Sequence, residues 1–119
     1  MGNPLRAESE VVVEGKTYRL HFTWNAAATF EDASGRALSD ALMDLVRERL
    51  SAKSLRAMLW AGLQKHHPDL TITEAGDLLG AMGRKEAIRL LGMALRYYFP
   101  EIAAADEKPE GKESGGPKA

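Results

Sequence analysis

The chain has 119 residues, of which 45% are hydrophobic and 28% are charged, and its formal net charge is −1. This length predicts one domain with a real hydrophobic core, because two cores would need a longer chain. The balanced charge excludes a general electrostatic attraction to nucleic acid or to an anionic membrane. The absence of cysteine excludes disulfides, thiolate nucleophiles and cysteine-based zinc sites.

Composition divides the chain into three parts. Residues 1–9 are predicted to be a flexible leader without the apolar run of a signal peptide. Residues 10–100 are predicted to form the folded domain, and no segment approaches the length of a membrane span. Residues 101–119 are rich in Glu, Lys, Gly and Pro and are predicted to be a disordered tail. We therefore expect a cytoplasmic protein with no membrane partner.

A β-hairpin is expected over residues 10–24. Its apolar side chains recur at the strand period of two, namely Tyr18, Leu20, Phe22 and Trp24. A two-residue turn is expected at Gly15 and Lys16. This turn pairs Val13 with Tyr18 and keeps the apolar side chains on one face. Because a lone hairpin is marginally stable in water, that face has to pack on helices.

A short helix is expected over residues 26–34. Asn25 is predicted to be its N-cap, and Gly35 is predicted to end it in a left-handed conformation. Glu31 and Asp32 are interpreted as solvated residues rather than as an acid/base pair, because adjacent helical side chains point about 100° apart.

Two further helices are expected over residues 39–50 and 53–67. The first is amphipathic, whereas the second is apolar around most of its circumference. Trp60 widens the apolar stripe of the second helix. The helix over 53–67 is therefore predicted to lie at the centre of a bundle. Gly62 in its middle costs about 1 kcal/mol relative to Ala, so the close approach of another backbone is expected there.

The last two helices are expected over residues 72–82 and 84–99. Thr71 and Glu74 have the spacing of a capping box at the start of the first. The final helix carries two apolar stripes, of which one can pack on the central helix. The other stripe must be covered by the hairpin or by a partner, and it consists of Leu90, Met93 and Tyr97.

These elements predict an α+β fold that is mainly α, with an N-terminal β-hairpin packed on a bundle of about five helices. No catalytic, cofactor-binding or metal-binding residue is predicted. His66 and His67 are adjacent, whereas metal ligands on one helix face need a spacing near i, i+4, so we interpret both as cations at a helix C-terminus. The segment Gly80–Lys85 has the glycine spacing of a phosphate-clamping loop, but no strand follows it, so nucleic-acid binding is the weakest alternative.

The order of several short motifs is more distinctive than any one of them. The motifs are the hairpin end Phe22-Thr23-Trp24-Asn25, a short helix with Glu31 and terminal Gly35, the run Leu55–Leu63 containing Trp60-Ala61-Gly62, the link Pro68-Asp69-Leu70-Thr71, the helix start at Glu74, and the closing Phe99-Pro100. In this order they resemble the gene transfer agent and tailed-phage tail protein family, whose members are labelled tail tube protein or tail assembly chaperone. The resemblance covers roughly residues 11–100.

The resemblance implies a non-enzymatic protein of tail assembly, most simply a chaperone that binds the tape-measure protein in the host cytoplasm and is absent from the mature particle. The major tail tube protein and a second copy of the chain are further possible partners. The alternative is a structural tail component that stays in the particle. Periodicity, not the family, makes Leu90, Met93 and Tyr97 the candidate partner-binding residues.

Overall fold

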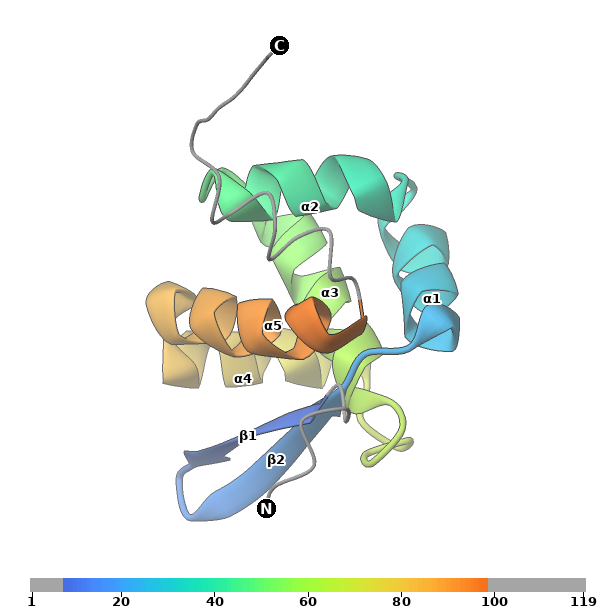
Figure 1. Cartoon of the computed structure of the whole chain (residues 1–119). Helices are drawn as coiled ribbons and strands as arrows, with labels where there is room; N and C mark the ends of the chain where they lie inside the picture. Colours follow the sequence, from blue (N-terminus) through green and yellow to red (C-terminus); the bar gives the residue numbers. More distant parts are fainter. Residues whose placement is uncertain (1–7, 99–119) are drawn as a thin grey trace, which may run out of the picture.

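The computed structural model describes residues 8–98 as an N-terminal antiparallel hairpin followed by five helices (Figure 1). The elements are β1 (Glu8–Val13), β2 (Lys16–His21), α1 (Trp24–Ser34), α2 (Leu38–Val46), α3 (Ala52–Leu63), α4 (Ile72–Met82) and α5 (Arg84–Tyr98). The predicted fold class is thus confirmed. The predicted tail over 101–119 lies outside the described residues, and β1 includes the last two residues of the predicted leader.

The hairpin turn lies one residue earlier than predicted. Glu14 and Gly15 form it, with positive φ angles of 53° and 80°. Positive φ at both central residues gives the turn a twist that matches the right-handed twist of the strands. Val13 therefore pairs with Lys16, and Tyr18 pairs with Val11. The pairing has moved by two residues, so Tyr18 and Leu20 keep their predicted face. The predicted end of the hairpin is wrong, because β2 ends at His21 and Trp24 lies in α1, where it is 68% exposed.

Helix α1 begins before its predicted N-cap. Thr23 is the N-cap, and its hydroxyl accepts a hydrogen bond from the Ala26 amide at 3.1 Å. Asn25 consequently lies inside the helix and is exposed, so its predicted capping role is wrong. The predicted end is confirmed: Gly35 has a left-handed φ of 76°, and its amide donates to the Glu31 carbonyl.

Helices α2 and α3 each end four residues before their predicted limits. The chain leaves α2 through Arg47 and through Glu48, whose φ of 57° is incompatible with a continuing helix. Leu50 is nevertheless buried in the loop that follows. Ser51 is the N-cap of helix α3, which ends at Leu63, after which a turn leads to Pro68.

Helices α4 and α5 match the predicted pattern closely. Both hydrogen bonds of the predicted capping box are present, because Thr71 and Glu74 exchange side-chain to amide bonds of 2.9 and 3.0 Å. Gly83 separates the two helices with a φ of 91°. An L-residue with a side chain rarely adopts that angle, so α4 has to end there.

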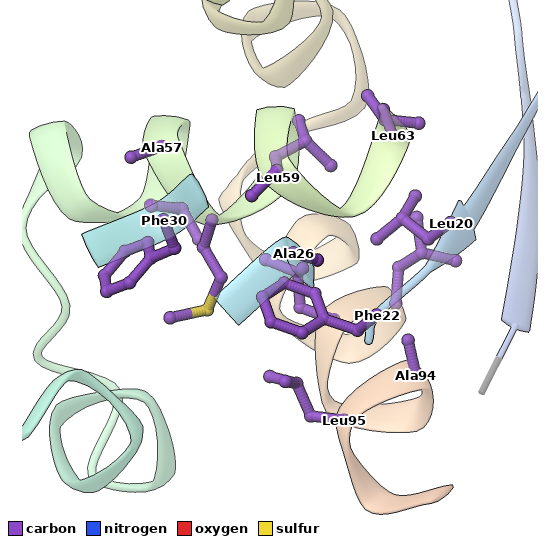
Figure 2. Packing of buried hydrophobic residues seen from close by; sticks show 14 of the residues in the cluster. Leu20, Phe22, Ala26, Phe30, Ala57, Leu59, Leu63, Ala94 and Leu95 are labelled. Carbon is purple, nitrogen blue, oxygen red and sulfur yellow. The ribbon is translucent and has the colours of Figure 1, made fainter. Parts of the chain in front are cut away.

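Helix α3 is the centre of the fold, as predicted. It packs against α1, α4, α5 and β2, while the hairpin lies beside α4 and α5 (Figure 1). In Figure 2, Phe22 lies between side chains of α3 and those of α5, Ala94 and Leu95. The side chains of Leu20 and Phe22 are completely buried in this core.

The close approach predicted at Gly62 is made by side chains and not by a backbone. A Cβ atom at Gly62 would lie 3.2 Å from Phe22 Cδ2 and 3.3 Å from Leu20 Cδ2. The glycine therefore makes room for the apolar side chains that join the hairpin to α3. This contact couples the sheet to the helical layer at the middle of the core.

Candidate functional site

The second apolar stripe of α5 is divided between the core and the surface. Leu90 is only 1% exposed, because β1 packs on this part of the helix. The Ser9 hydroxyl, 81 positions away in sequence, donates a hydrogen bond of 3.1 Å to the Leu90 carbonyl. The prediction that Leu90 is a partner-binding residue is therefore wrong, since the hairpin covers it. Met93 is 44% exposed, whereas the side chain of Tyr97 lies outside the described part of the structure.

Met93 lies in a groove between the end of α2 and the outer side of α5, with a volume of about 240 Å³. We call it the α2–α5 groove. Its apolar wall consists of Leu45 and Val46 from α2 and Ile88, Gly92 and Met93 from α5. Val46 is 39% exposed, so both helices present accessible apolar atoms. Helix α2 lies beside α5 on the side away from the hairpin (Figure 1).

Gly92 contributes an open space to this groove. A Cβ atom placed there would meet nothing within 4 Å, apart from the helix itself. A glycine inside a helix costs about 1 kcal/mol relative to Ala, and no neighbouring side chain requires its small size. The structure shows that its missing side chain deepens the groove.

The groove also carries charged groups. Arg89 and Arg96 line it from α5, and Glu48 lines it from the loop after α2. The Arg89 side chain donates to Glu86 Oε1 at 3.1 Å and to Met93 Sδ at 3.0 Å. The hydrogen bond from Arg89 lowers the pKa of Glu86, and the same bond raises the pKa of Arg89. The guanidinium therefore stays charged beside the exposed Met93 side chain.

The residues that carry the family resemblance have structural contacts elsewhere. Trp60 Nε1 donates to the Leu70 carbonyl at 2.8 Å and so holds the loop between α3 and α4. Glu31 Oε2 accepts from the Leu38 amide at 2.8 Å, at the start of α2. Asn25, Gly35, Gly62, Thr71 and Glu74 occupy the helix, cap and core positions described above. None of these motif residues lines the α2–α5 groove.

The two histidines after α3 do not act alike, and the predicted cationic role fails for His67. Its Nε2 accepts a hydrogen bond of 3.1 Å from the Arg19 amide on the outer edge of β2. Burial is the main cause that lowers the pKa of His67, and the positive charges of His66, Lys16 and Arg19 lower it further. The neutral imidazole is the form that can accept this bond. His66 instead lies near His21, with ring centroids 6.0 Å apart.

The alternative sites are weakly supported by the geometry. The segment Gly80–Lys85 is not the predicted loop, because only Gly83 lies between α4 and α5. The Arg84 guanidinium donates to the Leu50 carbonyl at 2.6 Å and so joins the start of α5 to the chain after α2. Within residues 8–98, no cluster of three or more His, Asp or Glu side chains could hold a metal ion. No helix in the same range is long and apolar enough to span a membrane.

Comparisons of the chain with protein-family models, with curated proteins and with solved structures find no match. The α2–α5 groove is therefore interpreted from its own residues.

Proposed function

We propose that the chain is a non-enzymatic assembly protein of a tailed phage or gene transfer agent, which binds an amphipathic helix of its client in the α2–α5 groove. The tape-measure protein is the proposed client. The accessible apolar groove is the observation that carries this proposal. The motif order of the sequence supports the choice of system, and the groove supports the mode of binding.

The size and lining of the groove favour a protein side chain over a small molecule. Small-molecule sites usually enclose about 300–1,000 Å³, whereas this groove encloses about 240 Å³ and is open to solvent along two helices. An amphipathic helix places apolar anchors at positions i, i+3 and i+4, which suits a shallow groove between helices. Met93 adds an unbranched side chain that adapts to different anchors.

Charge indicates which helices fit. Arg89 and Arg96 lie along the α5 side of the groove, and the loop after α2 carries exposed Arg47 and Arg49 beside Glu48. A client helix with acidic residues flanking its apolar stripe would complement these arginines. Tyr97 remains a proposed contact at the end of α5. Leu90 no longer belongs to the proposed surface, because the hairpin covers it.

The test compares client binding after the same substitution at two exposed valines. Val46→Asp places a carboxylate in the groove, whereas Val12→Asp places it on the outer face of the hairpin, where Val12 is 66% exposed. We expect Val46→Asp and Met93→Asp to abolish co-purification with the tape-measure protein, and Val12→Asp to retain it. Unchanged circular dichroism and thermal unfolding of all three variants show that the fold is intact. Equal client binding by all three would refute the groove as the client site.

Gly92→Leu tests the groove without adding charge. The new side chain fills the open space and improves helix propensity, so we expect equal or greater stability together with at least tenfold weaker client binding. Mass spectrometry of purified particles then separates the two assembly roles. A chaperone is absent from finished particles, whereas a structural tail component is present in stoichiometric amounts.

A further inference from the structure

We infer that residues 101–107 of the same chain, Glu-Ile-Ala-Ala-Ala-Asp-Glu, bind in the α2–α5 groove and compete with its client. The competition rests on the proposed function, whereas binding of the segment to the groove does not. Three observations carry the inference: where α5 ends, which side chains the segment contains, and which charges surround the groove.

The end of α5 places the segment within reach. The α5 residues that line the groove run from Ile88 to Arg96, and Tyr98 is the last described residue. At 1.5 Å per helical residue, this wall of the groove is about 12 Å long. An extended chain covers roughly 3.3 Å per residue, so a reversal of direction at Pro100 would bring residue 102 back to the level of Arg96, the last α5 residue of the groove.

The side chains of the segment match a small groove. Ile102 is the one large aliphatic residue after Phe99, and three alanines follow it. A single anchor with small neighbours suits a volume of about 240 Å³ in which the Cβ position of Gly92 is open.

Charge favours the same occupant. Residues 101–107 contain three acidic side chains, Glu101, Asp106 and Glu107, and no basic one. Arg89, Arg96 and Glu48 line the groove, and the loop that carries Glu48 also carries the exposed Arg47 and Arg49. Glu86 pairs with Arg89 and Asp44 with Arg49, so the four arginines exceed the three carboxylates by one positive charge. Covalent attachment through a short linker gives an effective concentration of order millimolar, so a weak contact suffices to occupy the groove.

The test uses the full-length chain and the methyl resonance of Met93. Ile102→Asp removes the anchor, and Ser114→Asp adds the same charge outside the segment as a matched control. We expect Ile102→Asp to shift the Met93 methyl resonance, with Met58 in the core unchanged, and Ser114→Asp to leave both unchanged. A free peptide of residues 99–108, added to the Ile102→Asp variant, should restore the original Met93 shift in a saturable manner.

Two results would overturn the inference. One is a Met93 resonance that is identical in the wild type and in Ile102→Asp. The other is a Met93 resonance that depends on protein concentration in the wild type, because a second copy would then occupy the groove.

Client binding separates this inference from the proposed function. If the segment occupies the groove in about 90% of the molecules, Ile102→Asp should bind the tape-measure protein about tenfold more tightly than the wild type. If no variant binds the tape-measure protein but the Met93 resonance still responds to Ile102→Asp, the proposed function fails and the binding of the segment stands. If the client binds the groove with equal affinity in both proteins, the competition fails and the proposed function stands.

Discussion

At the scale of single residues, His67 and Gly62 link the hairpin to the helical layer by different means. His67 provides an acceptor for an amide on the edge of β2, and Gly62 provides space for the side chains at the end of that strand. The first effect depends on a neutral imidazole at His67, and the second depends on the missing Cβ atom of Gly62. Stability should therefore respond to a substitution that adds a Cβ atom at Gly62, and its pH dependence should respond to one that removes the titrating group at His67.

The bond from the Arg19 amide to His67 makes stability dependent on pH. The lowered pKa of His67 means that the unfolded chain takes up a proton before the folded chain does. The stabilisation is therefore present above the ordinary histidine pKa of about 6.5 and is lost as the pH falls through the folded pKa. His67→Gln keeps an acceptor that does not titrate. Urea unfolding between pH 5 and pH 8 should show a smaller loss of stability at low pH for His67→Gln than for the wild type, and identical pH profiles would contradict the assignment.

Two glycines in helices should respond to alanine with opposite signs. At Gly62 the new methyl group would lie 3.2 Å from the buried Phe22 ring, and overpacking of a core typically costs about 1–3 kcal/mol. The gain in helix propensity is about 1 kcal/mol, so a net loss of roughly 1 kcal/mol is expected. At Gly80 nothing lies within 4 Å, so Gly80→Ala should stabilise the protein by up to about 1 kcal/mol. Chemical denaturation measures both, and stabilisation by Gly62→Ala would show that the core yields more easily than expected.

At the scale of secondary-structure elements, α1 supplies the cap of α2. The N-cap of α2 is Ala37, whose side chain forms no capping hydrogen bond. Glu31, seven residues before Leu38, accepts the amide of that residue instead. A carboxylate at a helix start also interacts favourably with the helix dipole. The two helices are therefore oriented by one side chain across the Gly35 turn.

Glu31→Ala should remove this cap. We expect a loss of about 1 kcal/mol in the free energy of unfolding, the usual cost of a lost helix cap. Asp32→Ala is the matched control, because Asp32 is an adjacent exposed carboxylate in the same helix, and its effect should stay within about 0.5 kcal/mol. Equal losses in the two variants would indicate a general effect of charge on α1.

At the scale of the whole molecule, α5 serves two surfaces. One side of the helix is covered by the hairpin and by α3, and the other borders the α2–α5 groove. Leu90 and Met93 are three residues apart on one sequence stripe, yet one belongs to the core and the other to the surface. The hairpin is therefore what limits the accessible part of α5.

Substitutions of Leu90 and Met93 should affect stability and client binding separately. Leu90→Ala should cost about 2–5 kcal/mol, the usual range for truncating a buried leucine, because Leu90 is only 1% exposed. Met93→Ala should change stability by less than about 0.5 kcal/mol while weakening client binding. Thermal unfolding and a client-binding titration of both variants provide the measurements. A large loss of stability in Met93→Ala would place that residue in the core and remove it from the proposed site.

Local signals in the sequence predicted most of the fold. The strand period of β2, the Thr71–Glu74 capping box and the helix ends at Gly35 and Gly83 depend on residues within about four positions of one another. The errors at the N-cap of α1 and at the hairpin turn also have local causes. Thr23 and Asn25 are both good caps, and Glu14 accepts the positive φ that moved the turn.

The candidate site was only partly predictable. Periodicity predicted a second apolar stripe on α5 that included Met93, which lines the groove. Periodicity cannot tell which members of a stripe another element covers, because that depends on the contact of β1 with α5, as between Ser9 and Leu90, 81 positions apart. The α2 wall of the groove and the role of Gly92 depend in the same way on how two distant helices meet.

The sequence alone determined the helices, the hairpin and most of their ends, since hydrogen bonds and side-chain periods within a few residues specify them. The tertiary structure alone decided that Leu90 is covered, that Glu31 caps the following helix and that an apolar groove stays open beside Met93. These facts depend on which surfaces meet when the chain closes on itself, and the burial of one apolar face leaves another accessible.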